Sequence, residues 1–334
     1  MRKLINDPFD AVDEMLDGVL VAHGQQVTRT PGGRGLVLRH RNPRRRVGVI
    51  TGGGSGHEPA FFGYIGPGLA DAVAVGNVFA SPSATPVAEV AREVARADGV
   101  IFLFGNYEGD IMNFGLAAEI LADEGIMSET LLVTDDVASS RDVIGDRRGV
   151  AGDVIVLKAA GARADEGADL AEVLEAAGYA NARTRTVGVG LGPCIVPTAG
   201  RATFELPEGS MDVGMGVHGE AGIRRAPLAT ADEVAQELIE MILRDGCSVE
   251  DPLTIVINTL GATPLMEGYI LLRAVVRQLE ASDVQIHRAV VGEYVTSLEM
   301  AGLSVTLVET DAELGRLLDA PASALAAPGL GAIA

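Results

Sequence analysis

Two patterns of apolar residues run through this chain, one with the period of a helix and one without interruption. Residues 10–22 place apolar side chains at helical spacing and predict an amphipathic helix. That stripe consists of Val12, Met15, Leu16, Val19 and Leu20. Continuous apolar runs, such as 47–50 and 100–104, are instead typical of strands buried on both faces of a sheet.

Predicted strands and helices alternate along the whole chain. Strands are expected at 47–50, 100–104, 130–133, 154–157, 211–217, 253–257, 289–291 and 305–308. Further helices are expected from Pro86, near 111–122, over 163–177, from a capping box at Thr230 to Leu243, over 264–281 and after Asp311. This alternation predicts an α/β fold, with mostly parallel or mixed sheets flanked by helices.

A segment rich in Gly, Pro and Thr, residues 186–210, interrupts the alternation. We expect the chain to pass here from one α/β domain, residues 1–185, into a second, residues 186–334. From about residue 320 the chain is mostly Ala, Pro, Gly and Leu, and we expect this tail to be extended or frayed.

The first predicted strand runs into a glycine-rich segment, Thr51-Gly52-Gly53-Gly54-Ser55-Gly56-His57-Glu58-Pro59. Glycine lets backbone N–H groups approach a ligand closely. A P-loop requires Lys-Ser/Thr where this chain has His57-Glu58, and the G-x-G-x-x-G spacing of a dinucleotide fold is absent. Two interpretations remain open: a polar cradle that presents the His57 imidazole, or a glycine-rich turn with a surface histidine.

His57, Asp110 and His218 share one context, because each is expected at the end of an apolar strand and beside glycine. Ligands of α/β sheets gather at the carboxyl ends of strands, so we expect the loops 51–57 and 105–110 to lie together. A carboxylate can act as general base, and a neutral histidine can add to a carbonyl as a reversible nucleophile. Structural, hydrogen-bonded histidines remain the alternative.

Composition removes several classes of function. A net charge of −20, 4% aromatic residues and the absence of Trp argue against nucleic-acid binding. Lys3 and Lys158 are the only lysines, so no Walker or Schiff-base lysine is proposed. Cys194 and Cys247 lack metal-ligand spacing. Without a signal core or an apolar run of membrane-spanning length, we expect a cytoplasmic protein that does not contact a membrane.

Several motifs in fixed order resemble the dihydroxyacetone kinase family, over nearly the whole chain to about Pro321. They are Lys3-Leu4-Ile5-Asn6-Asp7, the segment 52–59, Gly63-Tyr64-Ile65-Gly66, Ser81-Pro82, Asn106-Tyr107-Glu108-Gly109-Asp110 with Asn113-Phe114, Gly216-Val217-His218-Gly219-Glu220 and Asn258-Thr259-Leu260-Gly261-Ala262-Thr263-Pro264-Leu265. The resemblance is to the substrate-binding subunit, the DhaK or DAK1 domain.

The resemblance implies a role for each candidate residue. His218 is expected to form a hemiaminal with the ketone carbon, and Asp110 to accept the proton of the hydroxyl that is phosphorylated. His57 is expected to hydrogen-bond the substrate and support that step. Residues Gly54, Ser55 and Gly56 are expected to cradle the substrate hydroxyls. The family architecture implies two α/β domains and a homodimer.

The resemblance also implies a partner, because one-chain members continue into a helical nucleotide domain that this chain lacks. We expect a separate helical, DhaL-like subunit that holds Mg-ATP, or Mg-ADP rephosphorylated by a phosphotransferase-system phosphocarrier. No metal or cofactor is expected on this chain. Gly105 stands where many dihydroxyacetone-specific members have lysine. This departure is either neutral variation or an opening for a larger ketose such as erythrulose.

Two other functions stay open beside the kinase. Some paralogues implied by the resemblance bind the ketone as non-catalytic coactivators, but this chain keeps all three groups expected of active members. A generic sugar-binding protein has little support, because no signal peptide is present.

Overall fold

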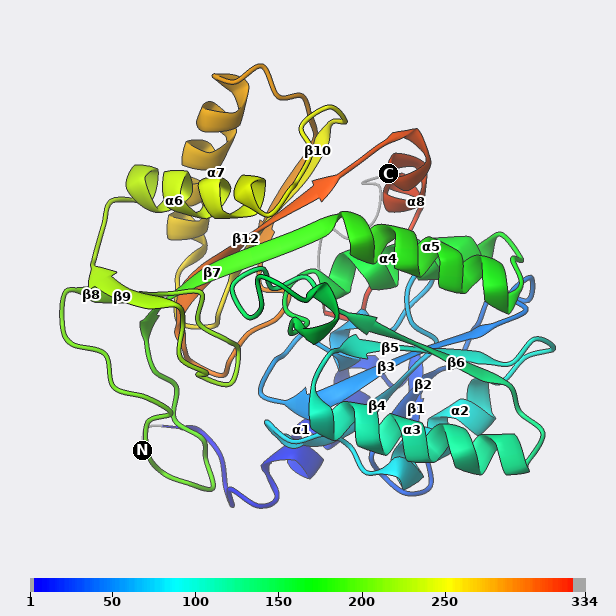
Figure 1. The fold of residues 1–334 in the computed structure, drawn as a ribbon. Helices are drawn as coiled ribbons and strands as arrows, with labels where there is room; N and C mark the ends of the chain where they lie inside the picture. The colour runs from blue at the N-terminus through cyan, green and yellow to red at the C-terminus, as the bar shows by residue number, and fades with distance from the viewer. Residues whose placement is uncertain (1–2, 327–334) are drawn as a thin grey trace.

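Two six-stranded sheets, one from each half of the chain, organise the fold (Figure 1). The computed structural model of the chain describes residues 3–326. The expected fold class, sheets flanked by helices in both halves, is confirmed. Among residues 3–326, no helix combines the length and apolarity that a membrane crossing requires.

The N-terminal sheet has the strand order β1-β2-β4-β3-β5-β6. Its strands are β1 Val27–Arg29, β2 Gly35–Leu38, β3 Gly48–Ser55, β4 Ala72–Val78, β5 Val100–Gly105 and β6 Ser128–Val133. The four strands β4, β3, β5 and β6 run parallel, while β2 pairs antiparallel with β1 and β4. All six residues of β5 are buried, as its continuous apolar run predicts.

The C-terminal sheet has the order β11-β10-β12-β7-β8-β9 and is mixed. Its strands are β7 Thr184–Gly192, β8 Ser210–Val213, β9 Arg224–Pro227, β10 Leu253–Thr259, β11 Ile286–Gly292 and β12 Ala301–Glu309. Only the β10–β11 pairing is parallel among these strands.

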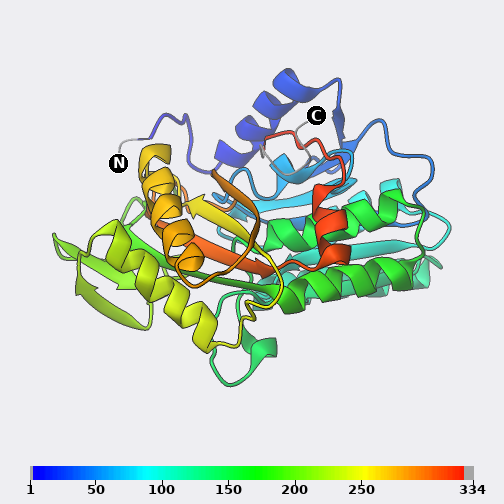
Figure 2. The ribbon, with the colours of Figure 1, turned by 90° about the horizontal axis from the view of Figure 1, so that it is seen from above.

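Eight α-helices cover the sheets in the described part of the chain. They are α1 Ala11–His23, α2 Ala84–Val94, α3 Glu108–Asp123, α4 Asp153–Asp165, α5 Leu170–Arg183, α6 Ala231–Arg244, α7 Leu265–Glu280 and α8 Ala312–Asp319. Figure 1 shows α2 and α3 below the N-terminal sheet and α4 and α5 above it. Seen from above, α6 and α7 lie over the other sheet (Figure 2).

The helix ends follow their sequence signals. Thr230 and Glu233 form the predicted capping box of α6, and Asp311 accepts from the Leu314 N–H at 2.9 Å to cap α8. Pro86, however, is the third residue of α2 and not its first.

The prediction of a strand at 154–157 is wrong, because these residues belong to α4. Nearly every residue of α4 is buried, so its apolar side chains show no helical stripe to distinguish it from a buried strand. The helix predicted over 163–177 is also misplaced. In its position α4 ends at Asp165 and α5 begins at Leu170, capped by Asp169.

The boundary between the halves is less sharp than the loop composition suggests. The second sheet begins at Thr184, close to the expected boundary, but one core cluster combines Val47 and Val154 with Val256 and Val308 from the other sheet. The division into domains 1–185 and 186–334 therefore stays a prediction.

The chain after α8 is extended, but its described part is not frayed. The N–H groups of Ser323, Leu325 and Ala326 donate to carbonyls of residues 67, 65 and 63, at 3.0, 3.1 and 3.2 Å. This segment thus ties the end of the second half to the first. The remainder of the expected tail, 327–334, lies outside the described residues.

Candidate active site

The glycine-rich segment is mostly strand, which corrects the expectation of a loop from residue 51. Strand β3 runs on through Ser55, and all its residues are buried. At Gly54 a Cβ would lie 2.7 Å from the backbone nitrogen of Ala80, so glycine is needed for close packing. The chain turns only at Gly56, whose φ of +97° is poorly accessible to other residues.

His57 follows this turn and is 3% exposed, so the interpretation as a surface histidine is wrong. Its Nδ1 lies 2.8 Å from the carbonyl oxygen of Thr296. The backbone N–H of Thr296 in turn donates to the carbonyl oxygen of His57 at 3.1 Å. The imidazole stacks on Phe79, with ring centroids 5.0 Å apart. Burial, followed by the charge of His218, lowers the pKa of His57 to about 3.

His218 comes from the other half and meets His57 ring to ring. The expected strand 211–217 ends at Val213, so His218 lies in the loop that follows β8. Its Nε2 is 3.0 Å from Nε2 of His57, and its Nδ1 is 3.1 Å from a carboxylate oxygen of Glu220. The rings of Tyr107 and Phe79 meet the His218 ring edge-on, at 4.9 and 5.3 Å between centroids.

Asp110 lies in the first turn of α3, where the helix N-terminus favours a carboxylate. One of its oxygens is buried without a hydrogen-bond partner. Burial raises the pKa of Asp110 to about 6, and the Ser81 hydroxyl and the charge of His218 oppose that rise. Asp110 follows β5, the parallel neighbour of β3, and Tyr107, three residues before it, meets the His218 ring edge-on, so Asp110 belongs to the same edge of the sheet.

Three strand ends of the N-terminal sheet thus contribute to one site. His57 follows β3, Phe79 follows β4, and Tyr107 and Asp110 follow β5. Because these strands are parallel neighbours, their carboxyl ends meet at one edge, as expected for a ligand site. The second half adds His218 through a loop.

Two of the expected substrate-binding residues, Ser55 and Gly105, are surrounded by other parts of the fold. The Ser55 hydroxyl donates to the Gly76 carbonyl at 2.8 Å and is therefore used inside the fold. A Cβ at Gly105 would lie 3.1 Å from the Tyr107 ring and 3.2 Å from the Gly149 carbonyl. A side chain at residue 105 would therefore press on Tyr107, which contacts His218. That residues 54–56 and 105 bind substrate stays a prediction.

The structure adds residues to which the sequence analysis assigned no role at the site. They are Phe79, Tyr107, Arg148, Glu220 and Thr296. Phe79 has a left-handed φ of 55°, which is uncommon for a bulky residue and is often found at functional sites. A signal for Glu220 was present, since it follows His218 by two residues inside a recognised motif.

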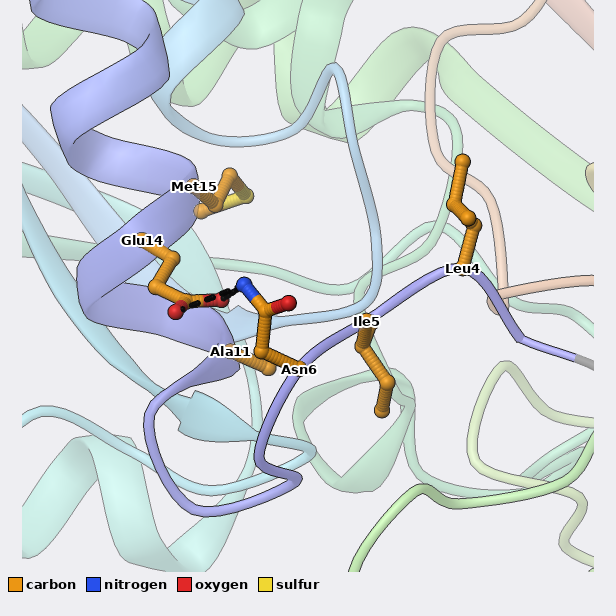
Figure 3. A pocket seen from close by; sticks show the side chains of 6 residues that line it. All are labelled: Leu4, Ile5, Asn6, Ala11, Glu14 and Met15. Carbon is orange, nitrogen blue, oxygen red and sulfur yellow. Dashed lines mark hydrogen bonds between the residues drawn. The ribbon is translucent and has the colours of Figure 1, made fainter.

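A surface hollow lies elsewhere, at the N-terminus (Figure 3). It has a volume of about 390 Å³ and is lined by Leu4, Ile5, Asn6, Ala11, Glu14 and Met15. The Asn6 amide donates to both oxygens of Glu14 at 2.9 Å, so the polar groups there are paired with each other. Within residues 3–326, no group of three His, Cys, Asp or Glu side chains is arranged to hold a metal ion.

The comparison with known families decides what this arrangement belongs to. A family model described as "Dak1 domain" matches residues 17–326. The chain belongs to the Dak1 family. The expected family is thereby confirmed.

Relatives and solved structures agree with this assignment. The dihydroxyacetone-binding subunit DhaK of the PTS-dependent dihydroxyacetone kinase 2 of Listeria innocua is 45% identical over 323 residues, 96% of this chain and 97% of that protein. The D-erythrulose kinase of Mycolicibacterium smegmatis is also 45% identical, over 96% of this chain but only 56% of that longer protein.

Among solved structures, the dihydroxyacetone kinase operon co-activator Dha-DhaQ superposes with a TM-score of 0.88 at 31% identity, over 94% of this chain and 97% of that chain. The fold expected from the sequence is therefore that of the family. The two kinase relatives confirm the expected enzyme class, a phosphotransferase.

Proposed function

We propose that this Dak1 chain is the substrate-binding subunit of a small-ketose kinase. In this proposal His218 holds the ketose as a hemiaminal, and Asp110 accepts the proton of the hydroxyl that is phosphorylated. The observation that carries the proposal is the 3.0 Å approach of the Nε2 atoms of His57 and His218, at the sheet edge where Asp110 has a buried, unpartnered oxygen. A nucleophile and a base for one small substrate thus lie in one site.

Accessibility distinguishes the two histidines. The His218 side chain is 28% exposed, whereas His57 is 3% exposed and anchored to Thr296. An incoming ketone therefore meets His218 first. Because the two Nε2 atoms are in hydrogen-bond contact, no carbon atom fits between them, and substrate binding must separate the rings.

Asp110 suits the role of base. With a pKa of about 6 it is ionised at neutral pH, yet it is more basic than an ordinary aspartate. Its unpartnered oxygen is free to accept a hydroxyl proton.

The phosphoryl donor belongs to a partner in this proposal. Both lysines are engaged elsewhere: Lys3 pairs with Glu299, and Lys158 is buried and donates to the Leu317 carbonyl at 2.6 Å. Arg148, beside the site, is paired with Asp136 and Glu220. Since phosphoryl transfer requires charge stabilisation, a helical DhaL-like subunit carrying Mg-ATP or Mg-ADP would supply it. A homodimer of this chain is part of the same proposal.

Dihydroxyacetone is the first substrate that we propose, and erythrulose is the second. The D-erythrulose kinase relative is as similar to this chain as the dihydroxyacetone-binding subunit, and Gly105 places no side chain beside Tyr107. The coactivator alternative is supported by the neighbouring structure, but the presence of all three reactive groups favours the kinase.

The experiment combines the purified chain with a DhaL-like subunit and Mg-ATP. It measures phosphorylation of dihydroxyacetone and of D- and L-erythrulose by the wild type, His218→Ala and Gly105→Lys. We expect His218→Ala to lose activity on every ketose and Gly105→Lys to lose more on the four-carbon ketoses. Wild-type rates in His218→Ala would overturn the covalent role, and ketone binding without any turnover would favour the coactivator.

A further inference from the structure

The hydrogen-bond partners of the two histidines fix the protons on their rings. The Thr296 carbonyl can only accept, so His57 Nδ1, 2.8 Å away, carries a proton. Glu220 is 3.1 Å from Nδ1 of His218 and, as a carboxylate, also accepts. Both Nδ1 atoms are therefore donors. The reactive nitrogen of each ring is Nε2, and these two atoms face each other.

Glu220 is held in place from both sides. Its second oxygen accepts the backbone N–H of His218 at 2.9 Å and lies 3.7 Å from Arg148. Arg148 is bound in turn by Asp136, at 2.7 Å. A Cβ at residue 216 would lie 2.2 Å from a Glu220 carboxylate oxygen and 2.3 Å from an Arg148 guanidinium nitrogen, so a side chain there would have to displace the ends of both side chains.

We propose that Glu220 is a positioning residue of the ketose-binding reaction. Resting on the proposed function, it holds His218 in the tautomer with a protonated Nδ1 and thereby assigns Nε2 as the nucleophile. This assignment has two consequences. It fixes how many protons the His57 and His218 rings carry before the ketose binds, and it defines the path of one of these protons during adduct formation.

Two imidazoles with both Nδ1 atoms protonated cannot face each other through two bare lone pairs at 3.0 Å. One proton must therefore lie between the Nε2 atoms, and the pair of rings carries three protons and one positive charge. The Glu220 carboxylate compensates that charge. Although burial opposes it, the hydrogen bond from His218 and the charges of His218 and Arg148 lower the pKa of Glu220 to about 2.

The bound proton is the one that adduct formation requires. As the ketone enters, the shared proton passes to Nε2 of His57, which frees the lone pair on Nε2 of His218. That lone pair forms the N–C bond with the carbonyl carbon, and the C=O π electrons take the proton from His57 to give the hemiaminal hydroxyl. The substituted His218 ring now carries the positive charge next to Glu220, so no proton is exchanged with solvent.

This balance predicts a distinctive pH dependence. His218 is faced by Glu220, His57, Tyr107 and Asp110, and Glu220 is faced by Arg148. In the wild type, the proton that the adduct requires is already held by the pair, so the equilibrium constant of the adduct should vary less with pH than in Glu220→Gln. In Glu220→Gln the pair no longer retains its third proton, so adduct formation must take one up and should strengthen about tenfold per unit fall in pH.

The experiment compares the wild type with Glu220→Gln, Glu220→Asp and Glu237→Gln. The last removes an α6 carboxylate that pairs with Arg224. Imidazole ¹⁵N NMR of the ketone-free protein reports the protonated nitrogens, and titration with dihydroxyacetone at several pH values reports the adduct. We expect Glu220→Gln to weaken the adduct about 10- to 100-fold at neutral pH. We also expect partial rescue in Glu220→Asp and no change in Glu237→Gln.

The NMR measurement separates this inference from the proposed function. An unprotonated Nδ1 on His218 in the wild type overturns the role of Glu220, even when a ketone adduct forms. Wild-type affinity and a flat pH profile in Glu220→Gln overturn it equally. A protonated Nδ1 that depends on Glu220, with no ketone adduct at any pH, overturns the proposed function and supports the tautomer assignment. A variant that fails to fold leaves the wild-type spectrum as the deciding result.

Discussion

Removing the charge of Asp110 should stabilise the protein while it abolishes function. Burial raises the pKa of this carboxyl from 3.8 to about 6. Because the folded-state pKa of Asp110 lies above the unfolded one, its ionisation lowers the free energy of unfolding as the pH rises from about 4 to about 6. The full cost persists at every pH above about 6. Each pKa unit corresponds to about 1.4 kcal/mol, which gives an upper bound near 3 kcal/mol. Partial solvent exposure reduces this, and we expect a gain of about 1–2 kcal/mol for Asp110→Asn at pH 7.

The pH at which this gain disappears tests its cause. As the pH falls below about 6, the cost of ionising Asp110 decreases, and below about pH 4 it is absent. The wild type and Asp110→Asn should therefore have the same free energy of unfolding below about pH 4. Urea denaturation at pH 7 and pH 4 measures both free energies of unfolding. The control is Glu119→Gln, on the exposed face of the same helix, which we expect to stay within about 0.5 kcal/mol of the wild type. An Asp110→Asn protein less stable than the wild type at pH 7, or a gain that persists at pH 4, would refute this reasoning.

Two other predictions address catalysis and packing. With Asp110 as the base, kcat/KM should fall about tenfold per pH unit below about pH 6, and a pH–rate profile that stays flat to pH 5 would contradict this role. Gly54→Ala should lose about 1–3 kcal/mol of stability, because its Cβ would lie 2.7 Å from the Ala80 backbone. Its control is Gly18→Ala in α1, which meets nothing within 4 Å and should gain up to about 1 kcal/mol; equal stabilities in urea denaturation would contradict the packing argument.

Local patterns predicted several of the elements whose burial is regular, although the buried strand β4 was missed. Strand β5 and helix α6 carry the uniform and the striped apolar pattern, respectively, and both are confirmed. Helix α4 misled the prediction because it is buried on all sides, which removes the stripe. The short strands β1 and β2 were missed, since three or four residues carry too little periodicity.

At the candidate site, too, some residues could be predicted from the sequence and others could not. His57, Asp110 and His218 could be named because each follows an apolar segment and is flanked by glycine. The partner of His57 in the other half could not be named in this way, because a contact across the two halves leaves no trace in local spacing. Thr296 lies 239 residues from His57, and only the folded chain brings its carbonyl to the imidazole.

The central claim is that His218 binds a ketone covalently, and ¹³C NMR with [2-¹³C]dihydroxyacetone tests it most directly. We predict that the labelled carbon, bound to the wild-type chain, loses its carbonyl resonance and acquires that of a tetrahedral carbon bonded to nitrogen and oxygen. The same signal should be absent with His218→Ala. A bound ketone whose carbon keeps its carbonyl resonance in the wild type would contradict the account.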